Sequence, residues 1–260
     1  MKKLFLFLPL ILILAGCGQQ PTLVRVNLDK SELDQITTST DNLIQDIRTG
    51  FNGQGIEGEI PAEVTIPNKI LLDVDFAMQA PFSDWSAPYD EACEEASMIM
   101  AYYYFAKKEL TKDLMNEEIL KLVDWEEKQG YKIDLTAEDT VDILNNYFNL
   151  NAWLENEVTA DRIKYELSLG HLVIPPTAGR ELDNDYFRQP GPIYHMFVIK
   201  GYDSKDFIVN DVGIGKGEGF RYSYEDLIDA VHDWDYDLAK DEMSAEEIKT
   251  TQKVLIIVAK

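Results

Sequence analysis

The apolar residues of this chain recur first at helical spacing and later in short unbroken runs. Apolar side chains dominate residues 96–105, within a helix predicted from Glu91 to about Lys107 and capped by Asp90. A helix that is apolar on nearly every side belongs in the centre of a domain. Spacings of three and four residues then predict amphipathic helices at about 113–128, 137–148 and 159–169. Thr136 and Asp139 predict a capping box at the start of the second of these.

Short apolar runs predict β-strands, most of them in the second half of the chain. The runs are 70–74, 172–174, 195–199, 207–209 and 254–258. A turn from Gly201 to Asp206 would join two of them into a hairpin, and a further helix is expected at 224–234. Helices followed by antiparallel strands are typical of an α+β fold.

The N-terminus has the pattern of an export signal. Lys2 and Lys3 precede the apolar run Leu4–Leu14, which is too short for a spanning helix. The residues Leu14-Ala15-Gly16-Cys17 resemble the bacterial lipobox. This resemblance implies cleavage before Cys17, diacylglycerol on the Cys17 sulfur, palmitate among the attached lipid, and a membrane anchor on the extracytoplasmic side. An ordinary signal with an incidental cysteine is the alternative.

Three segments are therefore expected. Residues 1–16 form the signal peptide, and 17–68 form a tether with a short helix near 33–47 that ends in glycines and prolines. Residues 69–260 form one globular domain. The sequence leaves undecided whether the anchor lies in the inner or the outer membrane, and which oligomer forms.

Charge and composition limit the classes of molecule that this protein can bind. The chain of 260 residues has 24 Lys and Arg against 47 Asp and Glu, a net charge of −23, and no basic stripe, which excludes a nucleic-acid binder. With 45% apolar residues it is not a disordered acidic tail. Acidity weakly favours neutral or cationic substrates. Two cysteines are too few for a cysteine zinc site, and we expect no cofactor.

Cys93 is the thiol left over once Cys17 is assigned to lipid. An unpaired cysteine is unusual in an exported protein. It falls in the first turn of the apolar helix, where free N–H groups and the helix dipole favour a thiolate. Flanking carboxylates, among them Glu94 and Glu95, would raise its pKa. An imidazolium in contact with the thiol could outweigh carboxylates that point into water.

His195 is the histidine best placed to supply that imidazole. It opens an apolar strand, whereas His171 is expected in a loop and His232 on the helix at 224–234 in a solvated role. The predicted hairpin brings Asn210 and Asp211 back beside His195. Either side chain could orient the imidazole, and strand register alone leaves the choice open.

These residues, in their order, resemble a known family. Gln79, Trp85, the run Cys93 to Met98, His195 heading its strand, Gly201-Tyr202-Asp203 and Asn210-Asp211 are similar to papain-like cysteine peptidases related to the bacteriocin-processing double-glycine peptidases, especially their free-standing secreted and lipoprotein relatives. The resemblance spans about residues 70–235. Two positions depart from it, since Glu94 stands where the family often has Gly and Val212 where it often has Pro.

The resemblance implies a papain-like α+β fold and a role for each residue. Cys93 would be the nucleophile, His195 the base, Asp211 the orienting third member, and Gln79 an oxyanion-hole donor. The expected function is a lipid-anchored extracytoplasmic cysteine hydrolase, a peptidase acting on peptides or proteins through an acyl-enzyme. A cell-wall peptide amidase or endopeptidase, and an inactive lipoprotein that binds a peptide or partner in its cleft, are the alternatives. Loops at 176–193 and around Trp85 should wall the cleft.

Overall fold

The computed structural model describes residues 10–12, 24–26, 66–239 and 243–260. Two compact units divide the chain, Met1–Val64 and Thr65–Lys260. In the first, β1 (Leu10–Leu12) pairs with β2 (Val24–Val26) in antiparallel fashion. Apart from these strands, the predicted signal segment, Cys17 and the tether with its helix, up to residue 65, lie outside the described residues. No helix within the described ranges is long and apolar enough to cross a membrane.

Three helices follow one another at the start of the second unit. They are α2 (Cys93–Ala106), α3 (Lys112–Gln129) and α4 (Ala137–Asn146), close to the predicted ranges. The capping box of Thr136 and Asp139 is present at α4. The expected Asp90 cap of α2 is wrong, because the helix begins at Cys93 after Ala92, with no side-chain cap. As its composition predicts, most of α2 is buried.

The centre of the unit is an antiparallel sheet of seven strands. Its order is β10 (Glu218–Ser223), β9 (Asp206–Asn210), β8 (Val198–Tyr202), β5 (Leu172–Ile174), β11 (Leu255–Ala259) and β4 (Asn151–Glu155), with β3 (Ile70–Leu71) paired to β8. The observed β3 is shorter than the predicted strand 70–74. Strands β4 and β10 were not predicted, because the apolar run of β4 is only three residues long, at 152–154, and the apolar residues of β10 alternate with polar ones over only a few positions.

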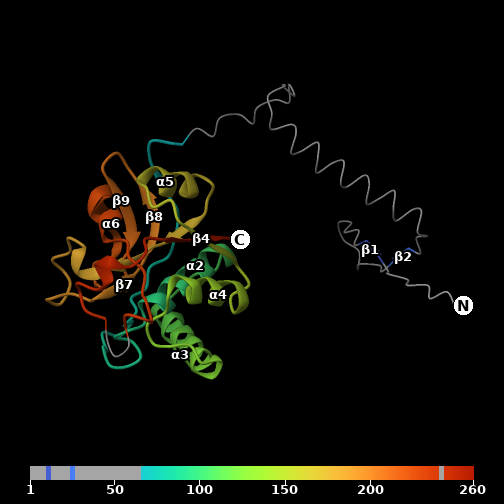
Figure 1. Cartoon of the computed structure of the whole chain (residues 1–260), viewed down its shortest axis with the longest axis horizontal. Coiled ribbons are helices and arrows are strands. Elements are labelled where there is room, and N and C mark those ends of the chain that lie inside the picture. The colour runs from blue at the N-terminus through green and yellow to red at the C-terminus, as the bar shows by residue number, and fades with distance from the viewer. Residues whose placement is uncertain (1–9, 13–23, 27–65, 240–242) are drawn as a thin grey trace, which may run out of the picture. The chain divides into compact units, whose positions relative to one another are not determined.

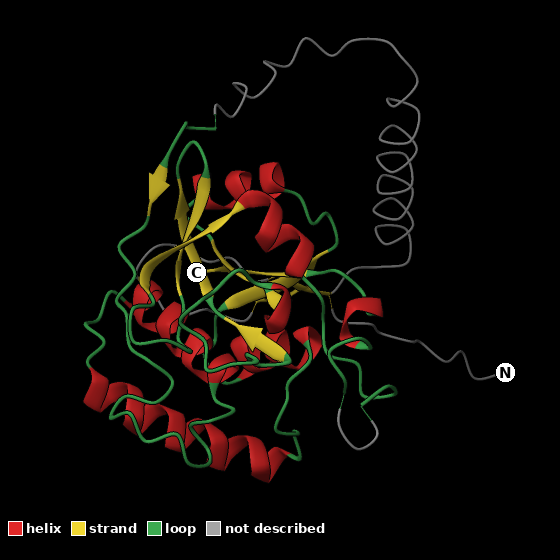
Figure 2. Cartoon of the chain, turned by 90° about the vertical axis from the view of Figure 1, so that its left-hand side faces the viewer, coloured by secondary structure: helices red, strands yellow, loops and turns green. Residues whose placement is uncertain are grey.

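Alternate residues of the strands separate two hydrophobic cores. Leu172 and Ile174 of β5 pack into the core built with α2, α3 and α4. Val173, between them, faces the core shared with α5 (Ala160–Ser168) and α6 (Tyr224–Ala230). Figure 1 shows α2, α3 and α4 on one side and α5 and α6 on the other, and Figure 2 shows the strands between helices. The fold is α+β, as the sequence predicts.

The apolar run predicted as one strand at 195–199 is divided at Phe197. Its first part, β7 (Tyr194–Met196), pairs with β6 (Pro176–Ala178) in a separate two-stranded sheet. Its second part is β8 of the main sheet. This break places His195 at the boundary between the helices and the sheet. The predicted helix 224–234 is also too long, since α6 ends at Ala230. His232 is therefore not helical, and its Nδ1 contacts the carbonyl of Thr251.

Candidate active site

Cys93 is the first residue of α2, and its side chain lines a cavity. The side chain is 6% exposed. Its position at the N-terminus leaves the N–H groups of the first turn without helical partners, so they can donate to an anion nearby. Ser97, one turn along, donates its hydroxyl to the Cys93 carbonyl at 2.7 Å.

His195 and Asp211 form a buried pair. His195 Nε2 lies 2.8 Å from Asp211 Oδ1, and the two residues are 3% and 0% exposed. Asp211 follows β9 directly, and the structure brings it, rather than Asn210, to the imidazole. The Asn210 amide instead donates to the carbonyls of Val74 and Asp75. The fold thus resolves the choice that strand register left open.

Three groups hold the Asp211 carboxylate from its other sides. The Tyr222 hydroxyl donates to Oδ2 at 2.6 Å, Asn184 Nδ2 donates to the same atom at 3.3 Å, and the Gly213 N–H donates to Oδ1 at 3.0 Å. Burial opposes ionisation of Asp211, yet the adjacent imidazole and the donors outweigh it and lower the pKa of Asp211. An ionised Asp211 accepts from Nε2–H and so fixes the tautomer in which Nδ1 of His195 is an acceptor.

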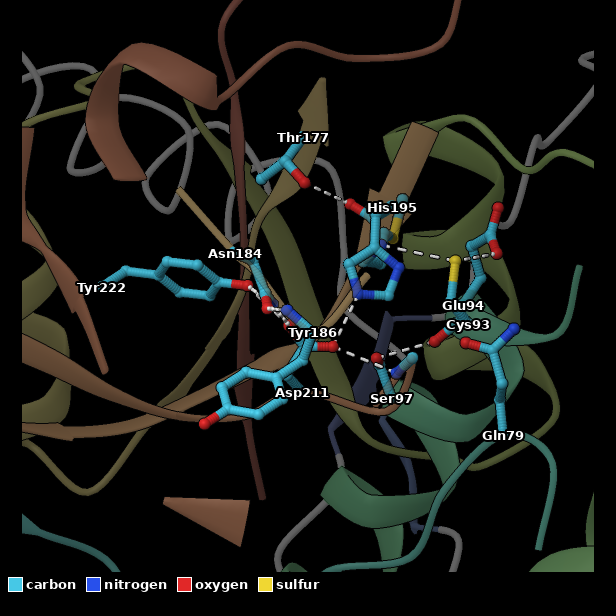
Figure 3. Close-up of polar contacts among 12 residues, drawn as sticks. Gln79, Cys93, Glu94, Ser97, Thr177, Asn184, Tyr186, His195, Asp211 and Tyr222 are labelled. Carbon is cyan, nitrogen blue, oxygen red and sulfur yellow. Dashed lines mark hydrogen bonds and ion pairs between the residues drawn. The ribbon is translucent and has the colours of Figure 1, made fainter. Parts of the chain in front are cut away.

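The backbone and ring of His195 are both constrained. Thr177 of β6 donates its hydroxyl to the His195 carbonyl at 2.6 Å, and the rings of Phe187 and Phe197 pack at 5.3 and 5.7 Å from the imidazole centroid. Gly213 leaves room for the ring, because a Cβ there would lie 2.9 Å from His195 Cε1. Figure 3 shows the imidazole between Cys93 and Asp211, with its second nitrogen on the side of the thiol.

At rest the Cys93 sulfur has two hydrogen-bond partners. Its Sγ donates to Glu94 Oε2 at 2.9 Å, and the Met196 N–H donates to Sγ at 3.4 Å. Among the hydrogen bonds of the described residues, none joins Sγ to His195. Burial, followed by the charge of Glu94, raises the pKa of Cys93 well above its usual value, so the resting side chain is a thiol.

Glu94 is buried rather than solvated, which corrects the expectation that the carboxylates flanking Cys93 point into water. It is 1% exposed, and its Oε1 accepts from the Leu135 N–H at 3.3 Å. Burial raises the pKa of Glu94 to about 8, with a smaller contribution from the charge of Asp134. Glu95 is buried as well, at 4% exposure. The predicted unfavourable effect of these neighbours on the thiolate is confirmed for both.

Gln79 lines the same cavity as Cys93 and His195. Its Nε2 donates to the carbonyls of Tyr89 and Asp90 at 2.9 and 3.2 Å, and its backbone N–H donates to Val212 at 3.1 Å. These bonds hold the residue beside Cys93, as Figure 3 shows. Its amide is committed to the loop in this state and must exchange a partner before it can donate to a substrate oxygen.

A cavity of about 610 Å³ opens over these side chains. The predicted walls are present, since Trp85 stands on one loop and Tyr186, Phe187, Arg188 and Pro192 come from the segment 176–193. Trp85 and Tyr186 are 43% and 54% exposed, so broad aromatic faces meet solvent at the rim. Within the described ranges, no three His, Cys, Asp or Glu side chains are grouped to hold a metal ion.

Sequence reasoning missed Tyr222, Asn184 and the contact between Cys93 and Glu94. Tyr222 lies on β10, a strand that was not predicted, and Asn184 lies in the 176–193 loop. Alternation of apolar and polar residues along 218–223 could have indicated the strand. It could not have indicated that Tyr222 contacts Asp211.

A thiol at a helix N-terminus facing an imidazole and a carboxylate from a sheet is the arrangement of papain-like cysteine hydrolases. This chain is such a cysteine peptidase-like hydrolase. Residues 71–238 match the model of the Peptidase_C39 like family, and the chain belongs to that family.

Comparisons with solved structures and with curated proteins add little to the family match. The chain is similar to a crystal structure from Bacillus anthracis described as a C39-like peptidase, with 16% identity and a TM-score of 0.47 over 75% of this chain and 98% of that chain. Among curated proteins, none matches this sequence significantly.

Proposed function

We propose that this protein is a lipid-anchored cysteine peptidase that acts on peptides outside the cytoplasm through Cys93, His195 and Asp211. One observation carries the catalytic part: the ionised Asp211 holds Nε2 of His195, leaving Nδ1 as an acceptor on the side of Cys93. The export signal and the resemblance of residues 14–17 to a lipobox support the anchor.

Acylation begins with the thiol proton. At rest the Cys93 proton is directed to Glu94, so it must be passed to Nδ1 of His195 before Sγ can attack. The resulting imidazolium is stabilised by the Asp211 carboxylate at 2.8 Å. The thiolate forms a bond to the peptide carbonyl carbon, and the carbonyl oxygen becomes an oxyanion.

Donors for that oxyanion are the Cys93 N–H at the start of α2 and, once it releases a loop carbonyl, the Gln79 amide. The imidazolium then gives its proton to the departing amine as the peptide C–N bond breaks. A water molecule, deprotonated by the neutral imidazole, attacks the thioester, and the regenerated thiol leaves with the proton. The product is a carboxylate, and the enzyme returns to its starting state.

The decisive experiment measures the reactivity of Cys93. Alkylation by iodoacetamide is followed against pH in the full chain and in His195→Ala, with mass spectrometry of the Cys93 peptide. Cleavage of a peptide library is measured in parallel. We expect alkylation to slow and cleavage to be lost in His195→Ala. Equal alkylation profiles, together with no cleaved peptide, would instead support a protein that only binds ligands in this cleft.

Membrane attachment has a separate test. Cells expressing the full chain are labelled with an alkyne analogue of palmitate, with Cys17→Ala as the matched variant. Labelling and membrane pelleting are expected for the parent chain, and loss of both for the variant. A Cys17→Ala chain that is still labelled would contradict lipid at this residue.

A further inference from the structure

A second cavity lies beside the catalytic one. Its volume is about 300 Å³, at the low end for ligand pockets. Asp90 and Glu91 line both cavities, so the two meet at the loop that precedes Cys93. The catalytic mechanism uses none of the residues that line only this second cavity.

Two buried carboxyl groups form its inner wall. Glu95 lies on α2, two residues after Cys93, and Glu126 lies near the end of α3. They are 4% and 5% exposed. Glu95 Oε2 and Glu126 Oε1 have no hydrogen-bond donor among the described residues. Neither side chain belongs to an ion pair found in the described part of the chain.

The two carboxyl groups share one buried site, where a retained proton avoids placing two negative charges together. Burial raises the pKa of Glu95 well above its usual value and that of Glu126 to about 7, and the charge of Glu126 adds to the effect at Glu95. Two acids forced together without a cation are costly to bury. A positive group placed between them would replace the proton and remove that cost.

The rest of the cavity suits a long side chain with a positive end. Val123, Tyr131 and Ile133 offer apolar surface to methylene groups, and Glu127 adds negative charge. Lys132 also lines the cavity, but its ammonium lies 4.4 Å from the ring centroid of Tyr236. Because no group of three potential ligands suited to a metal occurs in the described residues, an organic monocation fits the site better than a metal ion.

We propose that this cavity is a subsite for a lysine or arginine side chain of the peptide substrate, whose cationic end lies between Glu95 and Glu126. The inference rests on the proposed peptidase function. The peptide backbone would lie in the cleft over Cys93, and the basic side chain would pass Asp90 and Glu91 to reach the acid pair. Binding would release the retained proton to solvent.

Binding is tested without turnover in the full chain carrying Cys93→Ala. Blocked octapeptides are compared by calorimetry, each with lysine or norleucine at one position moved along the peptide. At one position lysine should bind about tenfold more tightly, with a proton release seen as a dependence of the enthalpy on the buffer. No preference at any position would overturn the subsite.

Variants then locate the effect. Glu126→Gln in the same background should abolish both the lysine preference and the proton release. Glu117→Gln, an equal charge change at an exposed position of the same helix, should keep both. If Glu126→Gln fails to fold, Glu95→Gln replaces it. If the lysine preference persists in the variant that folds, the assignment of the cationic end to Glu95 and Glu126 is overturned.

Cleavage of the same peptides by the parent chain separates the two proposals. Cleavage with a lysine preference supports both. Cleavage of lysine and norleucine peptides at equal rates overturns the subsite alone. A lysine preference in binding with no peptide cleaved leaves the subsite standing and overturns the peptidase function.

Discussion

At the scale of single residues, the contact between Cys93 and Glu94 distinguishes this site. A carboxyl group 2.9 Å from the Cys93 sulfur keeps the proton on it, whereas in the proposed mechanism the pair of His195 and Asp211 removes that proton. The two influences oppose each other across one sulfur atom. The balance between them sets the fraction of thiolate available for attack.

Replacing Glu94 by Gln should remove the negative charge that keeps the proton on the Cys93 sulfur. Without the negative charge beside it, the pKa of Cys93 should fall, since the charge of Glu94 helps to raise it. The pH profile of Cys93 alkylation measures the shift, with exposed Glu117→Gln as the control. An unchanged profile would show that the charge of Glu94 does not contribute to the pKa of the thiol.

Tyr222 supports the site through Asp211. In Tyr222→Phe, Oδ2 of Asp211 loses its 2.6 Å donor and keeps only the longer bond from Asn184. A hydrogen bond to a charged group contributes about 1.5–3 kcal/mol, so the free energy of unfolding should fall by about that amount. Because the imidazole is then held less firmly, kcat should decrease while KM stays the same. A change confined to KM would contradict this positioning role.

At the scale of elements, the site is assembled where three pieces of backbone meet. The N-terminus of α2 supplies Cys93, the short β7 supplies His195, and the loop after β9 supplies Asp211. Because the apolar run at 195–199 is interrupted at Phe197, its first part belongs to the two-stranded sheet and its second part to the main sheet. The loop after β9 also matters sterically, because the position of Gly213 in it allows no side chain next to the imidazole.

Gly213→Ala should therefore displace the His195 ring. The added Cβ would lie 2.9 Å from Cε1, and a misplacement of about 1 Å can cost about 10²-fold in rate. Gly215→Ala is the matched control, because nothing lies within 4 Å of its Cβ. Peptide cleavage and the His195 dependence of Cys93 alkylation measure the effect. Equal loss in both variants would indicate a general response of the loop.

At the scale of the whole molecule, buried acids link stability to pH. Burial raises the pKa of Glu94 to about 8 and of Glu126 to about 7, and raises that of Glu95 and Asp233 as well. In the unfolded chain glutamates titrate near ~4.3. Between these values the folded state holds more protons than the unfolded state. Stability from these groups is therefore present at low pH and lost as pH rises through the folded pKa values.

The free energy of unfolding should consequently decrease from about pH 5 to about pH 8. Each retained proton contributes a slope of about 1.4 kcal/mol per pH unit. His232, whose pKa is lowered by burial, opposes this over part of the range. Urea denaturation at several pH values measures the slope, and Glu126→Gln should flatten it. Stability that rises steadily over this range would contradict the buried acid pair.

The sequence by itself predicted the helices α2 to α5 and the α+β class, and it proposed Cys93 and His195 as the candidate nucleophile and base. Helix periodicity, the capping box at Thr136 and the position of a thiol at a helix start are local features, readable from neighbouring residues. Only the tertiary structure chose Asp211 over Asn210, divided the strand at Phe197 and ended α6 before His232. It also buried the side chain of Glu94 and placed Glu95 and Glu126 in the wall of one cavity. Those outcomes depend on which distant segments pack together, because burial and the partner across an interface fix where a polar side chain points and what charge it carries.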